Sequence, residues 1–408
     1  MSAKTTRIAI AVAVVAAAAF LITRRYSTGS DPQIVVGVLA PKTGFMSGHG
    51  ESIEMGARVA ERIINERGGV NGQEIRLVVL DTASDPATTA ERTKELIERH
   101  KANLLIGTGT SASTLAAIPP ATQSRVPFIY SLDGECKTCA MGDSSSVSNC
   151  VYGSGFTERM IVEPFLKYLH EKFGTEGEPF RVYYVGGDYV YPRTTNAYAK
   201  EVAERLGFIT VGEEYSDTST QDYTPVIRRI REARPSLLIV TNPGGSGVTF
   251  MRQAIQLGLD KEVVISGFAT FDQEAIDAMG DASEGVYAIN RYSMRLDNEE
   301  NKRFIEVFRE MFPNKPLLPG PTAAAGSYGS LMLAASGFEN AQSTEPDAFF
   351  EAMQGLEMEL PQGRVRLSPI NNVFEQHVYV LRIHQQQYEI IADLGMQKHP
   401  GFQGCSVR

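Results

Sequence analysis

Two tyrosines in the segment GGDYVYPRTTN, residues 186–196, are the first side chains whose types and spacing suggest binding chemistry. Tyr189 and Tyr191 stand where an apolar, strand-like run turns into a helix-like run, a place where small polar residues are usual. With Pro192 and Thr194 expected to start the helix, the tyrosines are two residues apart in an extended segment and point the same way. We expect them to form a wall that packs on a ligand and offers hydroxyl groups.

The segment GTGTSAST, residues 107–114, offers a second kind of chemistry. It follows an apolar run and opens a helix-like run, so that a hydroxyl side chain falls at the start of a helix. N–H groups of a first helical turn together with such a hydroxyl can receive a carboxylate or carbonyl oxygen. Ser111 is placed for that role, although the same serine could instead cap its own helix.

Alternating strands and helices must position these residues. From residue 33 the chain reads strand, helix, strand, helix to about residue 133, and a second block repeats the rhythm from about residue 156. Unbroken apolar runs such as QIVVGVLA are typical of parallel strands buried on both faces. The pattern predicts an α/β fold with two doubly wound parallel-sheet lobes, in which ligands bind beyond the carboxyl ends of the strands.

The predicted strand ends are rich in hydroxyl, glycine and aromatic residues and poor in charge. A cleft lined in this way suits a small polar ligand with a modest apolar part. None of the six histidines shows a metal-ligand spacing or a neighbouring nucleophile. We therefore expect a binding protein with no metal and no catalytic residues.

Composition and charge restrict the class of protein. The 408 residues suffice for two domains, and a net charge of −9 lacks the basic footprint of a nucleic-acid-binding protein. Residues 1–30 differ from the rest, because Lys4 and Arg7 lead into an uncharged apolar run, residues 8–22. This run fits either a cleaved signal peptide or an uncleaved membrane anchor, and both place the body in the periplasm or elsewhere outside the cytoplasm.

Four cysteines suit an oxidising compartment. Cys136, Cys139 and Cys150 share one polar segment, and Cys405 lies near the C-terminus. Their spacing matches no standard zinc module. We expect a disulfide between Cys150 and either Cys136 or Cys139.

The segment after the third strand also fits a dinucleotide fingerprint. Gly107, Gly109 and Ala112 match G-x-G-x-x-A, and Asp133 lies about 20 residues further on, where an acid can hold a ribose. The fingerprint usually occupies the first strand of a lobe, however, and nicotinamide cofactors are scarce outside the cytoplasm. An NAD-dependent oxidoreductase is the weaker alternative, and we expect no cofactor.

The order of elements, the segment GGVNGQEI after the first helix and the segment GTGTSAST resemble the type I periplasmic solute-binding proteins of ABC transporters. The resemblance covers nearly all of the chain after residue 33. Two further segments, GGDYVYPRTTN and LPQGRVRLSPINN, are similar to segments of the family branches that bind urea and short-chain amides. Other members of the family bind branched-chain amino acids.

This resemblance implies two lobes joined by three hinge crossovers that close on a ligand. We assign residues 31–154 and 288–357 to the first lobe and residues 155–287 and 358–395 to the second, followed by a tail, residues 396–408.

The resemblance also implies a set of pocket residues. Ser111 and Tyr130 would line the pocket from the first lobe, and Tyr189, Tyr191 and the loop at Asn242 from the second. Phe271 and Asp272 would stand where amino-acid binders use an acid to hold the ammonium group.

Two departures from the amide-binding relatives concern the pocket. Those relatives have an aromatic residue where this chain has Gly109, and a Thr-Pro pair where it has Leu132 and Asp133. A smaller side chain and an added carboxylate predict a roomier and more acidic pocket. This disfavours urea and favours a ligand with a positive or hydrogen-bond-donating end.

The expected function is capture of a small polar ligand between the lobes, with delivery to an ABC transporter permease in the membrane. The ligand would be an amino acid, an amide or a urea-like compound. A membrane-anchored sensor or receptor of the same fold is the alternative.

Overall fold

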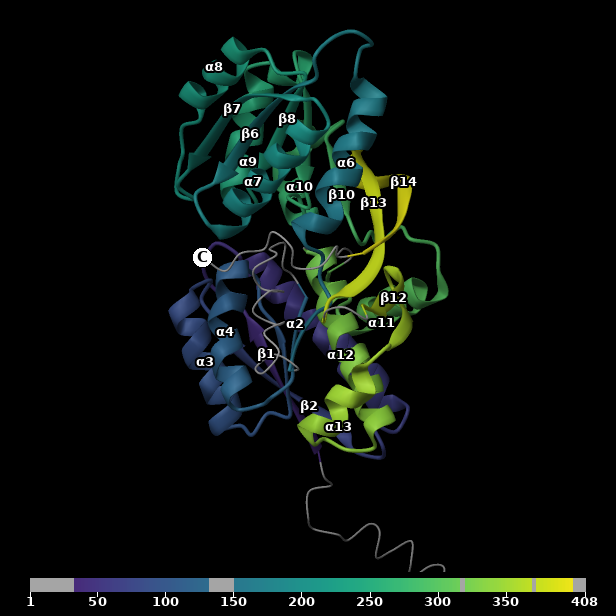
Figure 1. Cartoon of the computed structure of the whole chain (residues 1–408). Coiled ribbons are helices and arrows are strands. Elements are labelled where there is room, and N and C mark those ends of the chain that lie inside the picture. Colours follow the sequence, from purple (N-terminus) through teal and green to yellow (C-terminus); the bar gives the residue numbers. More distant parts are fainter. Residues whose placement is uncertain (1–32, 132–149, 316–319, 369–371, 399–408) are drawn as a thin grey trace, which may run out of the picture.

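Figure 1 shows the computed structural model of the chain, which describes residues 33–131, 150–315, 320–368 and 372–398. Two lobes lie one above the other in this view, each with its own sheet. The predicted cysteine pairing involves Cys136 and Cys139, which lie outside these ranges, as do residues 8–22 and Cys405. Within the ranges, no helix has both the length and the apolarity needed to cross a bilayer.

The first lobe contains five parallel strands in the order β2-β1-β3-β4-β5. All residues of β3 and β4 are buried, which explains their unbroken apolar sequences. The strands are β1 (Gln33–Ala40), β2 (Glu74–Asp81), β3 (Leu104–Gly107), β4 (Phe128–Tyr130) and β5 (Val151–Gly153).

The helices of the first lobe come from two distant parts of the chain. The early ones are α2 (Ser47–Glu66), α3 (Pro86–Glu98) and α4 (Ser111–Gln123). The late ones are α11 (Glu299–Met311), α12 (Pro321–Ala341) and α13 (Pro346–Met353). Helices α2 and α12 pack closely because Gly56 has no side chain, and a Cβ there would lie 2.0 Å from the carbonyl oxygen of Ala324.

The second sheet is mixed and has nine strands. Five are parallel, in the order β10-β9-β8-β6-β7: β6 (Arg181–Gly187), β7 (Ile209–Ser216), β8 (Leu237–Thr241), β9 (Val264–Phe268) and β10 (Tyr287–Asn290). The others are joined by antiparallel pairing: β11 (Glu357–Leu360), β12 (Gly363–Leu367), β13 (Phe374–His384) and β14 (Gln387–Gln397).

The helices of the second lobe are α6 (Glu158–Phe173), α7 (Val190–Arg205), α8 (Thr224–Ala233), α9 (Gly244–Gln256) and α10 (Gln273–Met279). Two short 3₁₀ turns, Leu259–Lys261 and Gly280–Ser283, complete it. The predicted α/β fold with two lobes is confirmed.

One helix start was predicted wrongly. We expected Pro192 and Thr194 to begin the helix after β6, but α7 begins at Val190. Proline is tolerated in the first turn because the N–H group it lacks would have no acceptor within the helix. Tyr189 is therefore the extended residue before the helix, and Tyr191 belongs to its first turn.

The chain passes between the lobes three times: after β5, after β10 and before β13. Figure 1 shows β13 running from one lobe to the other. A bridge between Gly153 and Val373 joins the first crossing to the third. The lobe boundaries that we assigned from the sequence remain a proposal. We assigned residues 288–357 to the first lobe, whereas β10 at residues 287–290 pairs within the second sheet.

Arg291 ties these crossings together. It is 1% exposed and donates to the carbonyl oxygens of Ser131, Ser154 and Thr322, which belong to the first lobe and to the first crossing. Burial lowers its pKa to about 10, although the charge of Asp272 opposes that effect. The guanidinium is thus a buried donor shared by segments that must stay adjacent.

We expect Arg291→Met to lower the free energy of unfolding by about 3 kcal/mol or more, because three buried carbonyl groups lose a donor. Urea denaturation of both proteins measures the difference. Arg303→Met, at an exposed position on α11, is the matched control and should change stability by less than about 0.5 kcal/mol. Equal stabilities of the two variants would contradict the role given to Arg291.

Candidate functional site

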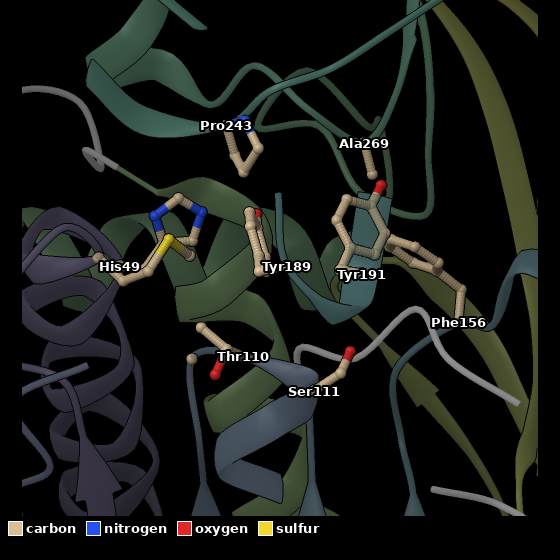
Figure 2. Close-up of a pocket in the computed structure, with 10 residues that line it drawn as sticks. His49, Thr110, Ser111, Phe156, Tyr189, Tyr191, Pro243 and Ala269 are labelled. Carbon is tan, nitrogen blue, oxygen red and sulfur yellow. The ribbon is translucent and has the colours of Figure 1, made fainter. Parts of the chain in front are cut away.

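A cavity of about 470 Å³ lies where the strand and helix ends of the two lobes meet. Figure 2 shows its side chains converging from both lobes. It is lined by Met46, His49, Gly109, Thr110, Ser111, Phe156, Tyr189, Tyr191, Pro243 and Ala269. This volume includes space open to solvent between the lobes.

The N-terminal end of α4 forms the first-lobe side of this cavity. Thr110 is the N-cap residue, and its Oγ1 accepts from the N–H of Ser113 at 3.1 Å. Ser111 is the first residue of the helix and is 2% exposed. The capping role therefore belongs to Thr110, and Ser111 lines the cavity beside the positive end of the helix dipole.

Aromatic rings form the opposite side. Tyr189 meets Phe45 of the first lobe edge-on, with ring centroids 5.8 Å apart. Tyr191 donates its hydroxyl to the carbonyl oxygen of Phe268, at the end of β9. Its ring lines the cavity, but its hydroxyl bonds to a backbone carbonyl of the second lobe, whereas we expected the hydroxyl to be offered to a ligand. Burial raises the pKa of both tyrosines, so both stay neutral.

An ion pair between His49 and Asp272 joins the lobes beside the cavity. His49 Nε2 lies 2.9 Å from Asp272 Oδ2, and the two side chains are 16% and 9% exposed. His49 belongs to α2 of the first lobe, whereas Asp272 precedes α10 of the second. Burial lowers the pKa of His49, but the hydrogen bond to Asp272 and the charges of Asp272 and Glu274 outweigh this, and the net shift is upward.

Three residues expected in the pocket are not among those that line this cavity. The hydroxyl of Tyr130 lies against Gly153 of the next strand, where a Cβ would be 2.5 Å away. Asn242 is fully buried and donates to the hydroxyl of Tyr223 at 3.2 Å. Phe271 is packed in the core of the second lobe.

The other residues expected in the pocket are Leu132, Asp133 and Asp272. Leu132 and Asp133 lie outside the described residues. Asp272 is close to the cavity but reaches it only through His49, its partner in the ion pair. No local sequence pattern marks His49, because its partner is far along the chain. Thr110, Phe156 and Pro243 also line the cavity without having been predicted.

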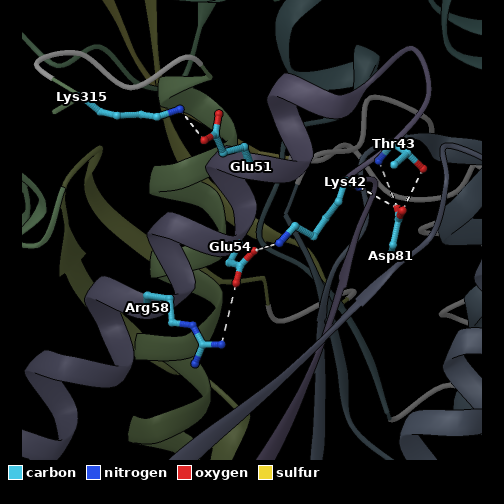
Figure 3. Close-up of polar contacts among 7 residues, drawn as sticks. All are labelled: Lys42, Thr43, Glu51, Glu54, Arg58, Asp81 and Lys315. Atoms are coloured by element: carbon cyan, nitrogen blue, oxygen red, sulfur yellow. Dashed lines mark hydrogen bonds and ion pairs between the residues drawn. The ribbon is translucent and has the colours of Figure 1, made fainter.

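The loop after β1 carries Phe45 and Met46 into the cleft, and Asp81 fixes that loop (Figure 3). Its carboxylate accepts from the N–H groups of Lys42 and Thr43 at 2.8 and 3.2 Å and from the hydroxyl of Thr43 at 2.8 Å. Burial raises the pKa of Asp81, but these bonds and one from Ala83 outweigh it and the pKa is lowered. Asp81 therefore stays charged at neutral pH and holds the loop in place.

Comparison with known proteins gives consistent matches. A family model described as "Periplasmic binding protein" matches residues 33–387. Leu/Ile/Val-binding protein homolog 6 of Brucella melitensis is 24% identical over 363 residues, 86% of this chain and 87% of that protein. The leucine-, isoleucine-, valine-, threonine- and alanine-binding protein of Pseudomonas aeruginosa is also 24% identical, over 83% of this chain and 87% of that protein.

A solved structure of higher identity is a solute-binding protein of an ABC transporter from Rhodopseudomonas palustris, in complex with 3,4-dihydroxybenzoic acid. It superimposes with a TM-score of 0.79 at 26% identity, covering 92% of this chain and 99% of that chain. The likeness therefore includes both lobes and the cleft between them.

Raising the pH should weaken the contact between the lobes. Since the pKa of His49 is raised above 6.5, the stability from its ion pair is complete below pH 6.5 and is lost as the pH rises through the higher value. We expect the Tm of the wild-type chain to fall over that range by more than the Tm of His49→Gln. Circular dichroism melts at constant ionic strength measure both.

His384→Gln is the matched control for this experiment. It removes an exposed pair with Glu284, 2.8 Å apart within the second lobe, and should keep the pH-dependent fall of the wild type. Equal falls for the wild type and His49→Gln would refute the contribution of the ion pair.

Proposed function

The chain belongs to the periplasmic binding protein family, and we propose that it captures a small carboxylate-bearing solute between its lobes and delivers it to an ABC transporter. Membership confirms the family resemblance drawn from the sequence. A member of this family is expected to lie outside the cytoplasm. Residues 8–22 would then serve as a signal peptide or a membrane anchor.

The observation that carries the proposal is the position of α4. Its N-terminal end points at a cavity of about 470 Å³ with Thr110 and Ser111 at the surface. The positive end of a helix dipole and hydroxyl donors together favour an anionic group. No aspartate or glutamate is among the described residues that line the cavity, so nothing in that lining repels a carboxylate.

The rest of the cavity suits a compact apolar or aromatic body. Tyr189, Tyr191 and Phe156 offer ring surfaces, and Met46 adds a flexible apolar side chain. The relatives are consistent with such a ligand, since one is named for binding leucine and similar amino acids and another holds 3,4-dihydroxybenzoic acid. Amino acids and aromatic acids share a carboxylate attached to a small body. We propose these two classes as the candidates.

The mechanism is closure about the three crossings. A ligand that contacts both α4 of the first lobe and Tyr191 of the second stabilises the closed state, in which these two parts lie close to each other. The closed form would then present its cargo to the membrane partner. A sensor that uses the same closure remains the alternative, and binding of a transporter permease to the loaded protein distinguishes the two.

A thermal-shift panel tests the ligand class. The chain would be refolded to remove carried ligand and mixed separately with leucine, valine, 4-hydroxybenzoate, 3,4-dihydroxybenzoate, acetamide, urea and putrescine. A ligand at 1,000 times its Kd adds about 4 kcal/mol of stability. We expect at least one carboxylate to raise Tm. A shift with only urea, acetamide or putrescine would overturn the proposal, and so would no shift at all.

Two pairs of variants then test the site. Ser111→Ala should weaken binding about tenfold, because one buried hydrogen bond to a charged group is lost. Ser124→Ala at the exposed far end of α4 should not. Tyr191→Ala should abolish binding, whereas Tyr191→Phe should retain it, since the hydroxyl bonds to Phe268 and not into the cavity. Isothermal titration calorimetry measures each Kd, and loss of binding in Tyr191→Phe alone would contradict this geometry.

A further inference from the structure

His49 stands between the cavity and the carboxylate of Asp272. The imidazole lines the cavity, while its Nε2 lies 2.9 Å from Asp272 Oδ2. Asp272 itself is not part of this lining and borders a separate cavity instead, together with Asn290, Thr322 and Tyr388. A ligand in the first cavity therefore meets the histidine and not the acid.

The other buried acid near the cavity is also paired. Glu158 follows Phe156 closely at the start of α6, is 1% exposed and influences the ionisation of Tyr191. Its Oε1 lies 3.5 Å from Nε of Arg159. Asp272 and Glu158 thus each already have an internal cation as partner. A third carboxylate, that of Glu274, lies against Gly48 and acts on the ionisation of His49, but it is not part of the cavity lining.

This arrangement has a consequence for charge recognition. An ammonium group buried without an anionic partner is strongly unfavourable. The N-terminal end of α4 already supplies positive potential, and His49 adds a cation when protonated. The raised pKa of His49 keeps it protonated over a wider pH range than a free histidine. The cavity therefore has partners for an anion and none in its described lining for a ligand cation.

We propose that His49 pairs with Asp272 and keeps this acid from a ligand in the cavity, so that the pocket selects carboxylates without an α-amino group over the matching amino acids. This inference rests on the proposed function. It narrows the ligand class of that proposal from amino acids or aromatic acids to simple alkyl and aryl carboxylates. His49 is then a specificity-determining residue.

Matched pairs of ligands that differ only in the amino group provide the test. The pairs are leucine with 4-methylpentanoate and phenylalanine with 3-phenylpropanoate, titrated into the refolded full chain by calorimetry. We expect the wild type to bind the carboxylate without the amino group more tightly by about tenfold or more, as buried charge pairs commonly contribute. His49→Ala uncovers Asp272 and should shift the affinity ratio toward the amino acid by about tenfold or more.

Three further variants make the result specific. His49→Ala with Asp272→Asn removes the uncovered acid and should cancel the gain in amino-acid binding. His49→Gln should also shift the ratio toward the amino acid, and it serves if His49→Ala does not fold. His384→Ala removes an exposed histidine–glutamate pair elsewhere in the second lobe and should leave the ratio unchanged.

The possible outcomes separate the two proposals. If the wild type binds neither member of either pair and no carboxylate of the thermal-shift panel, the proposed function fails and this inference fails with it. If it binds them but His49→Ala and His49→Gln keep the wild-type ratio, only this inference is overturned. A wild type that prefers the amino acids also overturns it, and loss of that preference in Asp133→Asn would identify the acid responsible.

Discussion

The buried guanidinium of Arg291 is the interaction on which the arrangement of the lobes depends. It donates to carbonyl groups of Ser131, Ser154 and Thr322, and so holds the end of a first-lobe strand, the first crossing and the start of α12 in one place. Gln376 adds a bond from the third crossing to the carbonyl oxygen of Gly155 at 2.6 Å. Because these donors are buried, the lobes can rotate about the crossings more readily than the crossings can separate.

Two contacts across the cleft depend on the way these crossings hold the lobes together. The edge-on rings of Phe45 and Tyr189 and the ion pair of His49 with Asp272 form only when the lobes approach. Both lie around the cavity at the start of α4, so the surfaces that close are those that would touch a ligand. The positive character of this site is local, because the whole chain carries a net charge of −9.

Sequence periodicity predicted most of the fold because long buried strands and amphipathic helices have strong patterns, as in β1 and α2. It missed β5 and α10, which have only three and seven residues and too few side chains to show a period. In the site, Ser111, Tyr189 and Tyr191 could be found because each falls at an element boundary. The pair of His49 and Asp272 could not, since it arises from the approach of two lobes and no local pattern encodes it.

The first lobe is assembled from two stretches separated by the second, with α2 packed on α12. During synthesis or export from the N-terminus, α2 therefore emerges long before the helix that covers its apolar side. The parallel strands of the second lobe, β6 to β10, are contiguous in the chain and can pair without waiting for a later segment. The order of emergence thus favours completing the second lobe's parallel core first, and it leaves β3 and β4 of the first lobe without the helix that packs on them until α12 has been made.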